Sequence, residues 1–348
     1  MISLREMSDE AVDERIFEIK GRMGDELFIP VHHYQRDEIV RFADCTGDSL
    51  ELSRVSAATR ARFIVFCGVY FMAEIARVLA SDEKRVFIPS RSAGCPLADL
   101  AQPDDVERLW NTLERTAPGD YVPVTYANSH AEVKALCGRN GGLVCTSSNV
   151  EKVFARILEQ GKKVFFMPDR NLGVNTAFAM GMAAEFGVVD RYSHEAPASI
   201  LLHPILVWDG FCVVHKVFTL DHVRAWRRAD KQCAIVVHPE CDPEVVLASD
   251  YSGSTSKIKR MVEQSPPGSR WVVGTELNMV QRLKRENADK FIEPLDSRVC
   301  MNMAKNRRRD LLAVLLAIEE RDYSVEVSLP EPVRGDARRA IERMLALG

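Results

Sequence analysis

The sequence predicts an α/β protein that contains three similar repeats. Three observations support this prediction. Short apolar and β-branched runs alternate with amphipathic helical patterns along the 348 residues, as expected for parallel sheets with crossover helices. The apolar runs are nearly continuous, which is typical of strands covered on both faces. One order of strands, helices and polar residues also recurs three times.

The elements follow from these runs in chain order. Strands are predicted at 28–31, 63–66, 86–89, 121–124, 143–145, 163–167, 200–208, 234–238 and 271–274. Helical patterns are clearest at 49–61, 150–161 and 254–265. The charged stretch 219–232 is interpreted as a linker, and 305–322 predicts an amphipathic terminal helix. The expected divisions are an N-terminal helix at 1–27, repeats at 28–118, 119–218 and 219–305, and a helical segment at 306–348.

Composition excludes several classes of protein. Apolar residues make up 46% and charged residues 28% of the chain, which is ordinary for a globular protein. The net charge of −4 argues against a nucleic-acid partner. Because no apolar run approaches 18 residues and the N-terminus is charged, neither a membrane helix nor a signal peptide is expected. Nine cysteines without a CxxC pair in a long chain favour reduced thiols and a cytoplasmic location.

Each repeat places polar residues at matching positions. The strands end in pairs spaced i, i+2, which are His32 and Tyr34, Tyr126 and Asn128, and His238 and Glu240. Residues at the carboxyl ends of parallel strands form ligand sites, and this spacing puts both members of a pair on one side of a strand. A single pair is more often structural, but three matching pairs favour a site. Glu240 is then the best candidate acid or base, with His238 beside it.

Two further sets of residues recur. Ser49, Ser147 and Thr255 are expected at helix starts, where free N–H groups bind phosphate or carboxylate, although Asp48 opposes an anion at the first start. Each repeat ends in a cysteine, namely Cys95, Cys212 and Cys300. Three converging thiolates would bind zinc or an iron–sulfur cluster and leave one open position. The remaining thiols are predicted to be structural: Cys45, Cys67, Cys137, Cys145, Cys233 and Cys241.

Ordered motifs over residues 28–305 make the chain resemble the quinolinate synthase family of NAD biosynthesis. They are HHYQRDEI, GDSLELS, VFCGVYFMAE, AGCPLAD, VTYANSHAEVKAL, CTSSN, PDRNLG, WDGFCVVH, HPEC, DYSGSTS and GTE. The resemblance implies three homologous three-layer αβα domains around a pseudo-threefold axis, with the active site at the centre. It also implies a [4Fe–4S] cluster on Cys95, Cys212 and Cys300, whose open iron acts as a Lewis acid on the substrate.

The reaction implied by the resemblance condenses iminoaspartate with dihydroxyacetone phosphate and releases phosphate and water. An aspartate-oxidising enzyme would supply the iminoaspartate. The implied catalytic residues are Glu240, Tyr34, His238 and Tyr126, and His215 would lie near the cluster. The implied substrate-binding residues are His32, Ser49, Tyr126, Asn128, Ser147, His238, Glu240 and Thr255.

Two other functions remain open from the sequence. Three-thiolate ligation also fits a zinc-dependent lyase or aldolase that acts on a related anionic substrate. A non-catalytic small-molecule sensor is disfavoured, because Glu240, His238 and all three cysteines are present. The chain departs from the usual family pattern at His33 in HHYQ, and the stretch 137–142 (CGRNGG) is interpreted as a small insertion.

Overall fold

The computed structural model describes residues 4, 6–192 and 195–347. It confirms the α/β class, with several short parallel sheets and helices packed against them. The chain forms two compact units: unit 1 comprises Met1–Cys95 and Val299–Pro330, and unit 2 comprises Pro96–Arg298 and Glu331–Gly348. Residues 1–3, 5, 193–194 and 348 of the predicted divisions lie outside the described residues. The boundaries of the three repeats stay a prediction.

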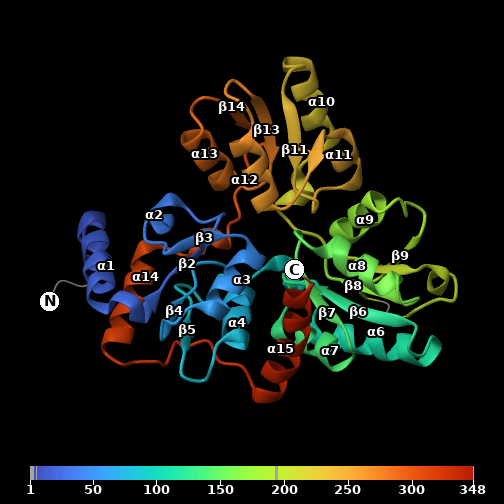
Figure 1. The fold of residues 1–348 in the computed structure, drawn as a ribbon, viewed down its shortest axis with the longest axis horizontal. Helices are drawn as coiled ribbons and strands as arrows, with labels where there is room; N and C mark the ends of the chain where they lie inside the picture. Colours follow the sequence, from blue (N-terminus) through green and yellow to red (C-terminus); the bar gives the residue numbers. More distant parts are fainter. Residues whose placement is uncertain (1–3, 5, 193–194, 348) are drawn as a thin grey trace. The chain divides into compact units, whose positions relative to one another are not determined.

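Unit 1 contains a three-stranded parallel sheet in the order β1-β4-β5 and a separate parallel pair β2-β3. The strands are Leu27–Phe28 (β1), Pro30–His32 (β2), Cys45–Gly47 (β3), Phe63–Val65 (β4) and Arg85–Phe87 (β5). The helices are Asp9–Met23 (α1), Asp37–Val40 (α2), Ser49–Ala58 (α3), Tyr70–Leu79 (α4) and Arg308–Glu319 (α14). Helix α14 lies beside α1 in Figure 1, and Leu311 and Leu315 join Ile16 and Ile19 in one buried core. This confirms the predicted terminal helix.

The first sheet of unit 2 has five parallel strands in the order β7-β6-β8-β10-β9. The strands are Tyr121–Tyr126 (β6), Leu143–Cys145 (β7), Lys163–Met167 (β8), Phe186–Val189 (β9) and Ile205–Trp208 (β10). The helices are Pro96–Asp99 (α5), Pro103–Thr116 (α6), Ala131–Arg139 (α7), Val150–Leu158 (α8) and Arg170–Ala179 (α9). Phe165 packs with residues of α6 and α7, whereas Phe166 contacts Phe154 of α8. Because neighbouring strand residues point to opposite faces, this sheet lies between two helical layers.

The second sheet of unit 2 is parallel in the order β12-β11-β13-β14. Its strands are Ala234–Val237 (β11), Tyr251–Ser252 (β12), Arg270–Gly274 (β13) and Phe291–Pro294 (β14). Its helices are Leu220–Ala229 (α10), Pro243–Ala248 (α11), Thr255–Gln264 (α12) and Leu277–Glu286 (α13). The interpretation of 219–232 as a linker was wrong, because most of it forms α10. This helix buries Val223 in a core with Ile235 and Val237.

The C-terminal helix Glu331–Ala346 (α15) packs on α7 and β7, as Figure 1 shows. Two arginine hydrogen bonds fix it, because Arg343 donates to the carbonyl oxygens of Gly138 and Gly142 at 3.3 and 2.7 Å. A Cβ atom on Gly138 would lie 1.8 Å from the carbonyl oxygen of Asp336. The stretch 137–142 therefore forms the docking surface of α15.

The predicted strand at 200–208 was too long. Residues Ile200–Leu202 form a 3-10 helix, and the strand begins only at Ile205. Pro204 separates the two elements, since proline has no N–H for a ladder hydrogen bond. The strands β3, β9, β12 and β14 were not predicted. β3 and β12 are only three and two residues long, β9 contains Gly187, and β14 contains Glu293 and Pro294.

Candidate active site

The predicted site residues fall in both units. Unit 1 contains His32, Tyr34, Ser49, Cys95 and Cys300. Unit 2 contains Tyr126, Asn128, Ser147, Cys212, His215, His238, Glu240 and Thr255. The contacts within unit 2 form a buried polar network, which centres on Glu240.

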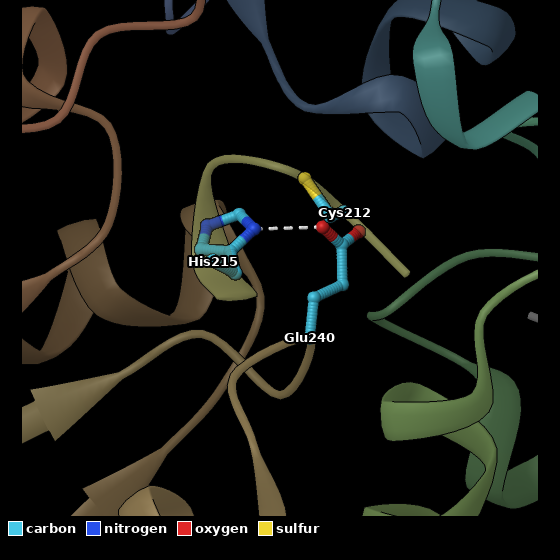
Figure 2. Close-up of side chains that lie close together, drawn as sticks. All are labelled: Cys212, His215 and Glu240. Atoms are coloured by element: carbon cyan, nitrogen blue, oxygen red, sulfur yellow. Dashed lines mark hydrogen bonds and ion pairs between the residues drawn. The ribbon is translucent and has the colours of Figure 1, made fainter. Parts of the chain in front are cut away.

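The carboxylate of Glu240 accepts one hydrogen bond on each oxygen. The hydroxyl of Tyr126, at the end of β6, donates to Oε1 at 2.6 Å. The Nδ1–H of His215, in the short 3-10 helix His215–Val217 (η3), donates to Oε2 at 2.7 Å, as Figure 2 shows. The other ring nitrogen of His215 lies 3.2 Å from the hydroxyl of Thr275. Tyr126, His215 and Glu240 are only 5%, 1% and 2% exposed, so this network is screened from water.

The environment fixes the protonation states of the network. Burial raises the pKa of the Glu240 carboxyl, but His238, His215 and the two donated hydrogen bonds outweigh burial and hold that pKa below its usual range. Burial and the neighbouring Glu240 raise the pKa of the Tyr126 phenol well above its usual value. Burial lowers the pKa of His238 to about 3. At neutral pH the site therefore holds an ionised carboxylate, a protonated phenol and a neutral His238.

The ring of His238 is oriented by its own turn. Its Nδ1 accepts the backbone N–H of Glu240 at 3.3 Å, so the neutral ring carries its proton on Nε2. The ring also stacks on His215, with centroids 4.4 Å apart. Unit 1 repeats this turn, because Nδ1 of His32 accepts the backbone N–H of Tyr34 at 3.2 Å.

The argument that placed each polar pair on one side of a strand was wrong. The strands β2 and β6 end at His32 and Tyr126, and β11 ends one residue before His238. The second member of each pair therefore lies beyond the strand, where side chains do not alternate as in a pleated strand. Asn128 is half-buried, and its Oδ1 atom is buried without a hydrogen bond from the described residues.

The predicted helix starts differ among themselves. Ser49 and Thr255 are the first residues of α3 and α12, behind the N-caps Asp48 and Ser254. The prediction was wrong for Ser147, because Asn149 is the N-cap of α8. Its Oδ1 accepts the backbone N–H of Thr146 at 2.8 Å, so a turn occupies this stretch before the helix begins.

A cavity of about 360 Å³ in unit 2 brings several of these segments together. Its lining includes Ser147, Asn175, Gly253, Ser254, Lys257 and Arg260. Lys257, Arg260 and the start of a ten-residue helix make part of this wall attractive to anions, whereas Glu151 brings one negative charge to the lining.

Four cysteines are half-buried, namely Cys45 and the three predicted ligands Cys95, Cys212 and Cys300. Sγ of Cys212, the ligand atom of His215 and that of Glu240 lie within 4.8 Å of one another. In unit 1 the segments next to Cys95 and Cys300 are joined, because Lys305 donates to the carbonyl oxygen of Ser92 at 2.8 Å.

Most of the other thiols are poor metal ligands. Cys67, Cys137, Cys145, Cys233 and Cys241 are buried, and burial raises the pKa of each above its usual value. Cys45 is half-buried and also has a raised pKa because of partial burial and two nearby carboxylates. Because the thiolate is the metal ligand, these six positions suit structural roles. The donor set of the chain is compatible with a metal cofactor.

The sequence analysis missed several buried polar residues around this network. They are Lys134, Asp169, Asn171, Asn175 and Thr275. Asp169 lies two residues after the last residue of β8 and caps α9 by accepting the N–H of Leu172 at 2.7 Å. Burial together with Glu240 raises its pKa well above the usual value. A polar residue after an apolar strand was a usable signal for Asp169 and Thr275, whereas the others lie inside helices.

Comparison with known proteins gives one consistent family. The family model described as quinolinate synthetase A protein matches residues 14–346. A quinolinate synthase from Geobacillus sp. is 42% identical over 99% of this chain and 96% of its own length. Another from Bacillus cereus is 43% identical over 97% of this chain and 94% of its own. The structure of the E-1-hydroxy-2-methyl-but-2-enyl-4-diphosphate reductase from Plasmodium falciparum aligns over 90% of this chain and 86% of its own. Its sequence identity is 11% and its TM-score is 0.29, so this alignment supports no inference.

The α/β fold and the buried Tyr126–Glu240–His215 network are typical of an enzyme, because buried titratable groups cluster at active sites. The family match and the extent of identity then settle the family. The chain belongs to the quinolinate synthetase A protein family and is an enzyme of NAD biosynthesis. Of the helices in the described ranges, none has the length and apolar character needed to span a membrane.

Proposed function

We propose that this chain condenses iminoaspartate with dihydroxyacetone phosphate to form quinolinate, with release of phosphate and water. The observation that carries the proposal is the buried network in which Tyr126 and His215 each donate to one oxygen of Glu240. Condensation, tautomerisation and dehydration each move a proton, and this network holds protons at defined atoms. The relatives named quinolinate synthase cover nearly the whole chain, which supports the same activity here.

The protonation states assign a role to each group in unit 2. Glu240 is assigned as the base, because its carboxylate is ionised at neutral pH and can accept a proton from a bound substrate. Tyr126 and the Nε2–H of His238 are donors that stabilise developing negative charge on oxygen. We assign to Tyr34 in unit 1 a second proton-transfer role, and its edge-to-face contact with His32, with centroids 4.8 Å apart, orients the phenol.

We further propose that Cys95, Cys212 and Cys300 hold a [4Fe–4S] cluster, with His215 close to it. The burial of five of the other cysteines and the raised pKa values of all six support this choice. When bound, the cluster supplies a Lewis-acid iron with an open position.

Substrate anions are assigned to the helix starts at Ser49 and Thr255 and to the turn that contains Ser147. These three residues would bind phosphate or carboxylate groups, with Asn128 and His32 as neighbouring polar contacts. Ser147 lines the cavity in unit 2 that also contains Lys257 and Arg260, which supports an anionic ligand there. Asp48 receives the N–H groups of Leu50 and Glu51, so the start of α3 has less capacity for an anion.

The wider context follows from the chemistry of the substrates. We propose a cytoplasmic enzyme in which the three predicted repeats surround the site, and an aspartate-oxidising enzyme as the source of the unstable iminoaspartate. Its other partners are small molecules, and the net charge of −4 gives no support for nucleic-acid binding.

The decisive experiment is anaerobic metal analysis combined with a quinolinate assay. The proposal expects about four iron and four sulfide per chain, as one such cluster requires, together with quinolinate formation. Cys95→Ala should lose most of the iron, whereas Cys45→Ala, a half-buried cysteine of the same unit, should keep it. A colourless active protein with about one zinc per chain would instead support a zinc lyase or aldolase. Binding of both substrates without turnover would identify a sensor.

A further inference from the structure

We propose that Asn171 and Asn175 are positioning residues that hold Glu240 in its reactive geometry, an inference that rests on the proposed function. Both lie on α9, four residues apart, so they project from the same face of the helix. They are 0% and 6% exposed. Two buried amides side by side on a helix need hydrogen-bond partners, and they find them in one short segment outside their own sheet.

That segment is the turn that contains Glu240, at residues 239–242. Asn171 donates from Nδ2 to the carbonyl oxygen of Glu240 at 3.1 Å. Asn175 donates from Nδ2 to the carbonyl oxygens of Pro239 and Cys241 at 2.8 and 2.9 Å. Three consecutive backbone carbonyls are therefore held by two side chains. Because the turn lies outside any strand, these hydrogen bonds fix its backbone in place of the hydrogen bonds that a neighbouring strand would provide in a sheet.

The same arrangement also reaches His215. Asn171 donates to Oδ1 of Asp242 at 2.9 Å, and the ammonium of Lys216 lies 2.7 and 2.9 Å from the two oxygens of Asp242. Lys216 adjoins His215 in η3. Asn171 and Asp242 therefore tie the backbone of His215 to the backbone of Glu240, and the short His215–Glu240 hydrogen bond joins their side chains.

This geometry has a consequence for rate rather than for binding. Proton transfer depends steeply on distance, and a displacement of about 1 Å at a catalytic group can cost a factor of about 100 in rate. Without the two amides the turn can shift while the side chains of Tyr126 and His215 stay where their own elements place them. We expect kcat to fall by about 10- to 100-fold and KM to change by less than about threefold.

The test uses Asn171→Ala and Asn175→Ala in the cluster-loaded enzyme, and each variant leaves the other amide in place. Asn287→Ala is the matched control, because Asn287 is also buried and donates to a carbonyl, that of Leu283, at 2.9 Å. If the amides act through Glu240, their kcat losses should vanish in a Glu240→Gln background. A loss that stays fully additive in that background, or an unchanged kcat in both folded variants, would overturn the proposal.

A second measurement does not depend on activity. The backbone N–H groups of Glu240 and Cys241 are bonded within the turn to His238. Hydrogen exchange at 239–242 should accelerate by about tenfold or more in the asparagine variants and stay unchanged in Asn287→Ala. Unchanged exchange would refute the positioning role even if the wild-type chain makes no quinolinate. If hydrogen exchange is faster in the variants but the wild-type chain makes no quinolinate, the proposed function is refuted, whereas the role of the two asparagines in holding the turn is supported.

Discussion

Replacement of Tyr126 by phenylalanine removes one hydroxyl from the most buried part of the site. The ring keeps its place at the end of β6, whereas the hydrogen bond of 2.6 Å to Oε1 of Glu240 is lost. Because the network is only a few per cent exposed, water cannot readily replace the missing donor. The carboxylate is then a buried charge with one fewer partner.

The magnitude follows from the type of hydrogen bond. A hydrogen bond to a charged group contributes about 1.5–3 kcal/mol. Loss of this bond removes a partner of the ionised form, so it should raise the pKa of Glu240. The free energy of unfolding at neutral pH should fall by about 2 kcal/mol. The acid limb of the kcat/KM profile should move to higher pH, because protonated Glu240 no longer acts as a base.

Urea unfolding and the pH dependence of quinolinate formation test this expectation. Tyr121→Phe is the matched control, since Tyr121 lies on the same strand and its hydroxyl bonds neutral carbonyl oxygens of Leu201 and His203 at 3.2 and 3.1 Å. This control should lose about 1 kcal/mol and keep the wild-type pH profile. Equal losses in the two variants, or an acid limb that does not move in Tyr126→Phe, would refute the assignment of Glu240 as an ionised base.

Three further outcomes are expected. The pKa of His238 is about 3 in the folded chain and 6.5 in the unfolded chain, so the free energy of unfolding should fall as the pH drops below about 7. Urea unfolding should show a loss of about 2 kcal/mol from this group between pH 7 and pH 5. This loss should be absent in His238→Gln. Gly138→Ala should destabilise the chain by about 1–3 kcal/mol or more, because its Cβ would clash with α15. Gly335→Ala is the matched change, with open space around its Cβ, and should stabilise the chain by about 0.5–1 kcal/mol. Thermal melts measure both effects. Removal of iron by anaerobic chelation should abolish quinolinate formation, and circular dichroism should show that the helices remain.

The sequence was sufficient to predict those elements that depend on a single short run of residues. Runs of apolar residues such as 163–167 became central strands, because a strand covered on both faces needs no polar residue. The residues after two of these strands, Tyr126 and Glu240, were selected as site candidates, and the structure places them in contact.

Local contacts also match between the first and third predicted repeats. Oδ2 of Asp44 accepts the N–H of Ile29, and Oδ2 of Asp250 accepts the N–H of Ile235, both at 2.7 Å and both over 15 residues. These contacts support common ancestry of the two repeats, which stays a proposal.

What the sequence did not reveal depends on contacts between distant segments. Asn171 and Glu240 are 69 residues apart, and neither periodicity nor spacing links a helical asparagine to a turn in another sheet. Lys134 on α7 was missed for a different reason, because its ammonium bonds the carbonyl oxygen and hydroxyl of Ser129, which is only five residues away. Such residues have polar side chains in amphipathic helices, so their composition resembles that of a solvated face.

Negative and positive groups in unit 2 have different proposed roles in the site. Two buried carboxyls have opposite environments. Burial and the nearby Glu240 raise the pKa of Asp169, whereas His238, His215 and two donated hydrogen bonds outweigh burial at Glu240 and lower its pKa. Glu240 is therefore the ionised base of the network, and His238 beside it is neutral. Such a network attracts protons and repels anions. The cations of the cavity, Lys257 and Arg260, provide the opposite potential. The proposed reaction between a dicarboxylate and a phosphate ester needs a negative environment for proton transfer and a positive one for anion binding. We therefore expect the two tasks to depend on different residues. Removal of the charge of Lys257 should raise KM with little effect on kcat.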